Sequence, residues 1–350
     1  MTVDFFTYIT STLHNPVLLL IVILNIGVII INGATDAPNA IATAVSTRSI
    51  KPRHAILMAA TGNFLGLVVV SFLTTAVAHT ITNLVSFGGD DRVALISLAA
   101  AMVAIIVWGV VTWWFGIPSS QSHSLIAGLT GAAIAAMNSF SAINWDAWGK
   151  VIWGIALSTI LGFTLGWAFS KIIAKLFAHT HRGKINTVFK WAQICSGAGV
   201  AFMHGAQDGQ KFMSIFLLGY ALTSGLGQSA QMLLPIWLMV FSALNIGLGT
   251  AIGGERIIKN VAGNMVKLET YQGFASSFSS FISLIIATFT GMPVSTTHCN
   301  TTAIMGAAAS KKKSAVRWQV AIDMVKTWIL TFPGCGLIGF VMAKLFLLFV

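Results

Sequence analysis

Long, uninterrupted apolar runs dominate this sequence, and they restrict the chain to a fold that spans a membrane. About 20 apolar residues cross one bilayer as a helix, whereas the strands of a barrel show short alternating segments. The runs here are continuous, so they predict helices. Composition agrees, because 56% of the 350 residues are hydrophobic and only 8% are charged. We therefore expect an all-α polytopic membrane protein, placed in the cell (plasma) membrane. The predicted spans are Pro16–Ser46, His54–Ala78, Val93–Phe115, Ser119–Met137, Trp148–Phe177, Trp191–Leu222, Leu233–Gly253, Phe274–Thr290, Pro293–Ala309 and Trp318–Val350.

Basic residues cluster in the short connections between these runs. Most of the 20 lysine and arginine residues lie in Arg48–Arg53, Lys171–Lys190, Arg256–Lys267 and Lys311–Arg317. Such clusters are typical of cytoplasmic loops, so the net charge of +11 reflects membrane topology and does not indicate a nucleic-acid partner. With ten spans, all four segments fall on one side of the membrane and both termini on the other.

Two motifs occur twice, at nearly the same separation. Residues 116–133 read GIPSSQSHSLIAGLTGAA and residues 291–308 read GMPVSTTHCNTTAIMGAA, while NGATD at 32–36 corresponds to HGAQD at 204–208. This predicts a tandem duplication, with residues 1–175 as the first repeat and residues 176–350 as the second, together forming one transport unit. Each half holds about five spans, an odd number, so the second half is expected to be inverted. Inverted repeats are typical of secondary transporters, whose sites lie near the midplane at broken or re-entrant helices.

Asp36 and Asp208 hold matching positions within apolar segments of the two halves. An ionisable group inside a span is unfavourable unless it is paired, hydrated or functional. Gly33 and Pro38 beside Asp36 predict a break in the helix that frees backbone carbonyls. Carboxylates, carbonyls and amides suit a small hard cation, and a carboxylate could equally take a proton or simply be satisfied by its neighbours. The candidate residues for cation or proton coupling are Asp36, Asp208, Asn32, Thr35 and Gln207.

Pro118 and Pro293 each precede a run of small polar residues and then an apolar helical segment. This pattern predicts two helix starts capped by Ser or Thr. A helix start presents N–H groups to an anion, and inverted symmetry would point both starts at one site. The alternative is two ordinary capped helices at the membrane edge. The candidate anion-binding residues are Ser119, Ser120, Gln121, Ser122, Ser295, Thr296, Thr297, Asn39 and Lys211.

Three further residues leave alternatives open. Lys211 shares a helical face with Asp208, so it could form a structural salt bridge, supply positive charge to an anion or replace a bound cation. His123 and His298 occupy matching positions and could accept protons. The preferred interpretation is that they pack in the core and bond to backbone carbonyls.

At these motifs the sequence resembles the inorganic phosphate transporter (PiT) family. The family signature is Gly-Ala-Asn-Asp-x-x-Asn-Ala in each half, followed by Pro-x-Ser/Thr-x-x-His. Gly33–Ala40 and His204–Lys211 match the first element, and Pro118–His123 and Pro293–His298 match the second. The resemblance covers essentially the whole chain. It implies phosphate uptake, an inverted-repeat fold and a homodimer, with phosphate and the lipid bilayer as partners and no cofactor other than a co-transported proton or sodium ion.

The sequence departs from the signature at three positions that bear on coupling. Thr35 and Gln207 replace the Asn before each Asp, and Lys211 replaces the second Asn of the second half. Sodium-coupled members look closer to the full signature, and the Asp-Gly-Gln-Lys form resembles bacterial members that use protons and carry metal–phosphate complexes. We therefore favour proton coupling, with a sodium symporter or a sulfate permease of the same family as alternatives.

Two other classes of protein fit less well. No metal-ligand spacing such as His-Glu-x-x-His and no nucleophile elbow is present, so we expect neither an enzyme nor a firm metal site. A passive anion channel would not need symmetric carboxylates within its spans.

Overall fold

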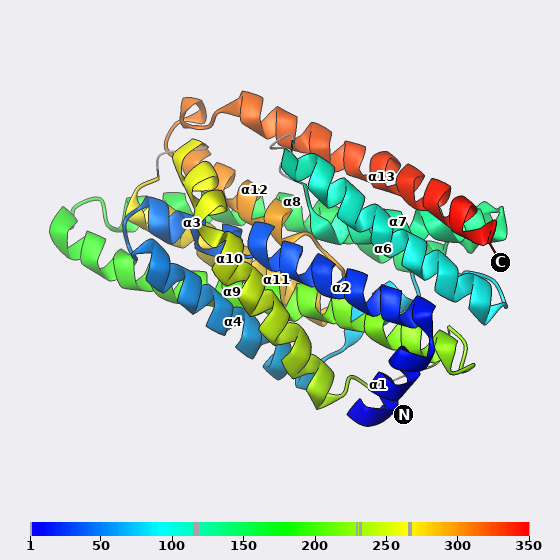
Figure 1. Cartoon of the computed structure of the whole chain (residues 1–350). Coiled ribbons are helices and arrows are strands. Elements are labelled where there is room, and N and C mark those ends of the chain that lie inside the picture. The colour runs from blue at the N-terminus through cyan, green and yellow to red at the C-terminus, as the bar shows by residue number, and fades with distance from the viewer. Residues whose placement is uncertain (1, 115–118, 229, 231–232, 265–267, 350) are drawn as a thin grey trace.

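The computed structural model of the chain describes residues 2–114, 119–228, 230, 233–264 and 268–349, and this part is almost entirely helical (Figure 1). Helices occur at all ten predicted ranges. Phe115, Pro118, Lys267 and Val350 belong to predicted segments but lie outside the described residues, as do the side chains of Arg256 and Lys259. The helices are α1 (Phe5–His14), α2 (Pro16–Thr35), α3 (Asn39–Ser46), α4 (Pro52–Leu73), α5 (Ala76–Thr82), α6 (Asp91–Trp114), α7 (Gln121–Met137), η1 (Phe140–Ala142), α8 (Trp145–Leu176), α9 (Arg182–Thr223), α10 (Ile236–Asn264), α11 (Thr270–Phe289), α12 (Thr296–Ala309), η2 (Lys313–Ala315) and α13 (Trp318–Leu347).

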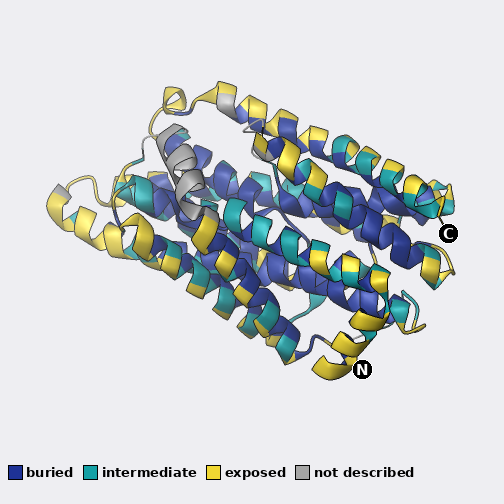
Figure 2. Ribbon diagram, in the orientation of Figure 1, coloured by how far each residue is buried: buried dark blue, intermediate teal, exposed yellow. Residues whose placement is uncertain are grey.

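The outer surface of the bundle is apolar. Large hydrophobic side chains such as Leu65 and Phe72 on α4 and Trp153 and Ile160 on α8 are exposed, which suits contact with lipid and not with water. Figure 2 shows buried residues concentrated along the inner helices and exposed residues along outer faces and ends. Six helical segments among the described residues are long and apolar enough to cross a membrane, so the chain is a multi-pass membrane protein. They are Pro16–Ser46, Pro52–Leu73, Asp91–Thr112, Trp145–Leu176, Thr270–Phe289 and Ala321–Leu347.

The connections between α3 and α4, α8 and α9, and α12 and α13 lie at one end of the bundle, and both termini lie toward the other (Figure 1). Three of the predicted basic segments, Arg48–Arg53, Lys171–Lys190 and Lys311–Arg317, lie in these connections or on the helix ends beside them. The charge of these three segments is therefore gathered at one end, as the sequence predicts for a cytoplasmic side.

Helix packing follows the duplication. The helix α7 of the first half packs along α13 of the second, and the corresponding α12 of the second half packs along α8 of the first. Likewise α4 packs on α9, and its counterpart α10 packs on α2. Each contact recurs with the two halves exchanged, which is consistent with an inverted repeat; the boundary near residue 175 stays a prediction.

Two short helices begin inside the protein. The helices α7 and α12 have 17 and 14 residues, or about 26 Å and about 21 Å of helix, less than the roughly 30 Å of a bilayer core. Ser120 and Ser295, directly before them, are buried. Both helices therefore begin within the bundle, and they fit the predicted re-entrant elements better than complete crossings.

The two aspartate segments differ in backbone. In the first half α2 ends at Thr35 and α3 begins at Asn39, with Pro38 between them, because proline lacks an N–H and fixes its own φ. The second half has no such break, since α9 runs through Asp208 as one helix of 42 residues. The sequence predicts the first break from Pro38, and no proline lies near Asp208 to cause a second.

Glycines allow α4 and α9 to cross closely. A side chain at Gly66 would collide with the carbonyl of Phe202, and one at Gly205 would collide with the backbone of Asn63. This close crossing sets Asn63 beside the helical turn that carries Asp208.

Candidate functional site

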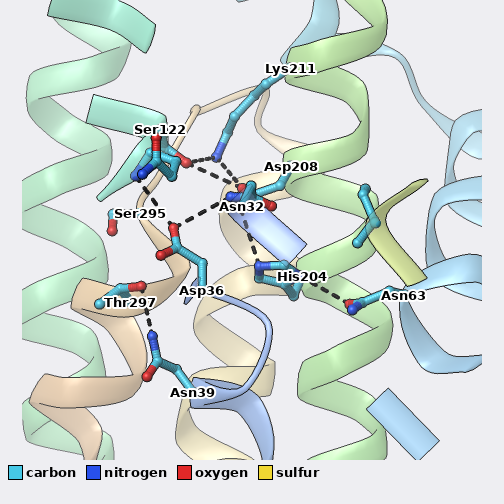
Figure 3. Close-up of polar contacts among 12 residues, drawn as sticks. Asn32, Asp36, Asn39, Asn63, Ser122, His204, Asp208, Lys211, Ser295 and Thr297 are labelled. Carbon is cyan, nitrogen blue, oxygen red and sulfur yellow. Dashed lines mark hydrogen bonds and ion pairs between the residues drawn. The ribbon is translucent and has the colours of Figure 1, made fainter. Parts of the chain in front are cut away.

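The carboxylates of Asp36 and Asp208 meet in the middle of the bundle, where a single amide joins them (Figure 3). Asn32 Nδ2 donates to Asp208 Oδ2 over 2.9 Å and lies 3.4 Å from Asp36 Oδ2. All three residues are buried. Asp36 is the C-cap of α2, and its N–H still bonds to the Asn32 carbonyl over 2.8 Å, so the helix ends at the site.

Lys211 is fully buried and holds its ammonium group among three oxygens. Its Nζ donates to Ser122 Oγ over 2.8 Å, to Asp208 Oδ1 over 2.7 Å and to the Val294 carbonyl over 2.6 Å. An ammonium has three N–H donors, and these three bonds use all of them. The set of a carboxylate, a hydroxyl and a backbone carbonyl is the kind of oxygen set that binds a small cation.

The two re-entrant helices begin at this cluster. Ser120 caps α7 by accepting from His123 N over 3.4 Å, and Ser295 caps α12 by accepting from His298 N over 3.2 Å. The Gln121 N–H, at the first position of α7, lies 3.4 Å from Asp36 Oδ2. The positive end of α7 therefore faces the carboxylate of Asp36. The start of α12 joins the cluster through the Val294 carbonyl, which accepts from Lys211.

Each half also reaches across to the other at matching positions. Asn39 Nδ2 donates to Thr297 Oγ1 over 3.0 Å, and Lys211, which corresponds to Asn39, donates to Ser122, which corresponds to Thr297. The two contacts are therefore counterparts under the duplication. They tie the third residue after each aspartate to the start of the re-entrant helix of the opposite half.

The remaining predicted residues lie around this core. Thr35 Oγ1 is 3.2 Å from Asp36 Oδ1. Gln207 donates to Thr288 Oγ1 and to the Met292 carbonyl, so its amide faces the segment before α12. Ser119 is paired with Thr112 on α6 at 2.7 Å and does not contact either aspartate. Several buried oxygens have no hydrogen-bond partner in the described part of the chain and suit a ligand: Asn32 Oδ1, Gln207 Oε1 and Thr296 Oγ1.

The motif reading missed His204 and Asn63. His204 Nε2 lies 3.3 Å from Asp208 Oδ2, and His204 Nδ1 lies 3.0 Å from Asn63 Oδ1. Asn63 in turn donates to Thr250 on α10. This series of contacts, from Asp208 through His204 and Asn63 to Thr250, positions Asp208 relative to α4 and α10. The signal for His204 was present, because it precedes Asp208 by four residues and so shares its helical face.

The surroundings of His123 and His298 differ in part from those that the sequence predicts. Their ring centroids are 4.3 Å apart, with His298 stacked on Trp328 at 3.6 Å and His123 near Phe332 at 5.0 Å. They are packed, as expected, but none of their four ring nitrogens has a hydrogen-bond partner among the described residues. The expected bonds to backbone carbonyls are therefore wrong for this part of the chain.

Chemically, the site joins two carboxylates, one ammonium and two helix starts in a buried space. No group of three or more His, Cys, Asp or Glu side chains that could hold a metal ion occurs among the described residues. The arrangement is suited to holding an anion and a small cation or proton side by side.

Comparison with known proteins assigns the chain to a family. The model of the phosphate transporter family matches residues 32–339. A Bacillus subtilis (strain 168) protein named "Probable low-affinity inorganic phosphate transporter" is 38% identical over 321 residues, covering 92% of this chain and 94% of that protein. A Rhizobium meliloti (strain 1021) protein of the same name is 36% identical over 330 residues, covering 94% and 96%. The solved structure titled "The sodium-dependent phosphate transporter" shares the fold, with a TM-score of 0.83 at 21% identity over 96% of this chain and 100% of that one.

Proposed function

This chain belongs to the phosphate transporter family, and from that membership we propose that it takes up inorganic phosphate by symport with a cation. It is an inorganic phosphate transporter of the cell membrane. The symport mechanism, the cation and the residues that bind each are the proposal. Its relatives are named as transporters, and we propose that no covalent step accompanies transport.

One observation supports the location of the site above all others. Both aspartates, Lys211 and the starts of α7 and α12 converge on one buried cluster built from the two halves. A site shared by two repeats can be opened first to one side and then to the other by rocking one unit against its neighbour. This is the property that secondary transport needs.

We place phosphate between the starts of α7 and α12. Free N–H groups and the positive dipole ends favour an anion there. Hydroxyls can donate to or accept from phosphate in either of its protonation states, and the site offers Ser120, Ser122, Ser295, Thr296 and Thr297 around the two helix starts. In this state Lys211 has no donor left for phosphate, so we assign it an electrostatic contribution and not a direct bond.

We propose that the Lys211 ammonium stands where a cation would otherwise bind. Its three oxygen partners at 2.6–2.8 Å form a cation-like set, and a fixed charge there would repel a sodium ion. Coupling would then depend on protons, with Asp36 as one carrier, because no ammonium group of the described residues pairs with Asp36. Asn32, Thr35 and Gln207 complete the surroundings of the coupling site.

Sodium coupling is the second candidate. The structurally similar transporter is titled sodium-dependent, and the unpartnered oxygens Asn32 Oδ1 and Gln207 Oε1 would suit a sodium ion beside Asp36. Sulfate remains the alternative substrate, since it shares the shape of phosphate. We also expect a homodimer, which light scattering of the protein in detergent would test.

The deciding experiment is uptake of radiolabelled phosphate into proteoliposomes, with proton and sodium gradients imposed separately. A proton-coupled symporter accumulates phosphate with an inward proton gradient in the absence of sodium, and excess sulfate leaves uptake unchanged. Uptake that merely equilibrates under both gradients would indicate a passive pathway and contradict symport.

A further inference from the structure

A pair of buried histidines lies beside the proposed site, with unused hydrogen-bonding capacity. His123 and His298 are each only 1% exposed, and their four ring nitrogens have no partner in the described part of the chain. A neutral imidazole has one N–H donor and one acceptor nitrogen. Leaving a buried polar group unpaired costs about 1–3 kcal/mol. Such a pair is expected to gain a ligand in another state of the protein.

The two histidines occupy equivalent places in the two halves. Each is the third residue of its helix, with its backbone N–H bonded to the capping serine, and their rings contact each other at 4.3 Å between centroids. Equivalent residues that touch lie where the halves meet. The preceding residues, Ser122 and Thr297, contact Lys211 and Asn39. The pair is thus one residue away from the proposed anion site in both re-entrant helices.

The charged groups around the pair are few. From α9, Lys211 and Asp208 act electrostatically on His123, and the histidines act on each other. From α13, the Cys335 thiol bonds to the Ser124 carbonyl, and the Asp323–Lys326 pair is exposed; on α12 itself, the Cys299 thiol bonds to the Ser280 carbonyl. The helix α3 has no ionisable side chain. The ionisable residues of α6, α8 and α11 lie in exposed or half-buried positions toward the helix ends: Asp91, Arg92, Asp146, Lys150, Lys171, Lys175 and Tyr271.

We propose that His123 and His298 together form a proton-binding site that is filled when phosphate binds, and that this proton is transported with the anion. This rests on the proposed function. On loading, the lone pair of one ring nitrogen accepts a proton from a hydronium ion, which leaves as water. On release, that N–H bond breaks and the proton returns to water on the other side. Phosphate itself undergoes no bond change.

Electrostatics couples protonation of the histidine pair to the binding of phosphate. With Asp36 and Asp208 ionised and Lys211 charged, the site has one negative charge in excess, and phosphate near neutral pH adds about one to two more. In the empty site, a positive charge on the histidine pair is attracted by this one excess negative charge but repelled by Lys211 and the two helix starts, so it is held only weakly. Once the anion is bound, the same charge is attracted to it. Because such coupling is reciprocal, the carrier prefers to be empty of both or loaded with both, as a symporter requires.

The test uses His123→Gln and His298→Gln in the full-length protein, with Trp328→Phe as the control that alters the ring packing around His298 without removing an ionisable group. Phosphate binding is measured by titration calorimetry in buffers of different ionisation enthalpy, which gives the number of protons taken up per phosphate. Reconstituted variants are then assayed for proton-driven accumulation and for phosphate–phosphate exchange at equal pH. We expect each Gln variant to bind and exchange phosphate while proton uptake falls and accumulation is lost.

Any other outcome contradicts the proposed proton-binding role of the two histidines. Unchanged proton uptake and accumulation in both variants would overturn the proposal. A folded variant that no longer binds phosphate would assign the histidines to the anion site and also overturn it. Failure of the proposed function itself looks different, because the wild-type protein would then fail to accumulate phosphate under a proton gradient.

Discussion

The ammonium of Lys211 donates to the hydroxyl of Ser122 over 2.8 Å, and so ties the middle of α9 to the start of α7. Its counterpart in the other half is the 3.0 Å contact from Asn39 to Thr297. The two contacts occupy equivalent positions, but the donor is a charged ammonium at Lys211 and a neutral amide at Asn39. We therefore expect the two halves to contribute differently to cation coupling.

The first prediction concerns the carboxylates. Asp36→Asn and Asp208→Asn should each abolish phosphate accumulation, because each removes a coupling charge with little change in shape. The two should differ in stability, since Asp208 pairs with Lys211 at 2.7 Å and Asp36 has no ammonium partner in the part of the chain that the structure describes. Breaking a buried ion pair costs about 3–5 kcal/mol. Thermal unfolding in detergent should therefore show Asp208→Asn as the less stable variant, and near wild-type uptake by either would remove that carboxylate from the mechanism.

The second prediction concerns the anion. Ser122→Ala and Thr297→Ala should each weaken phosphate binding, by about 1.5–3 kcal/mol for each lost hydrogen bond to a charged group. Titration calorimetry measures the effect. Thr302→Ala is the control on α12, because among the described residues that hydroxyl bonds to carbonyls of its own helix alone. Equal phosphate affinity in all three variants would mean that the helix-start site is misplaced.

The third prediction concerns the cation. The wild type should accumulate phosphate under an inward proton gradient without sodium, because Lys211 fills the cation-like oxygen set. Lys211→Asn restores the residue found at Asn39, and it should reduce proton-driven uptake and admit sodium as a driving ion. Lys326→Asn is the control, since that lysine is exposed on α13. A wild type that is inert without sodium would contradict proton coupling and leave the phosphate assignment intact.

The fourth prediction concerns packing. Gly66→Ala should destabilise the protein by about 1–3 kcal/mol, because the added Cβ collides with the backbone of α9. Gly149→Ala is the matched control, as a Cβ there meets nothing within 4 Å. Unfolding in increasing denaturing detergent should separate the two. Equal stability would show that α4 and α9 can move apart freely.

Much of the fold could be predicted from local sequence. Apolar length marks the helices, and Pro38 marks the break, because both act through the backbone of the segment itself. The convergence of the motif residues could also be predicted, because an inverted duplication implies one site shared by the two halves. The cross-contacts of Asn39 and Lys211 could not be predicted, since they depend on how two distant re-entrant helices pack. The lack of hydrogen-bond partners at the rings of His123 and His298 could not be predicted for the same reason, because a sequence does not show which carbonyls lie within reach.

The contrast between the broken segment at Asp36–Pro38 and the unbroken α9 has a mechanical consequence. A segment broken between two helices and a continuous helix bend differently under the same force, even when they carry matching residues. In an alternating cycle built on this fold, the inward-facing form is therefore not related to the outward-facing one by the exact two-fold symmetry of the repeat. The two forms then bind the substrate with unequal affinity, while the imposed gradients alone set the direction of net transport.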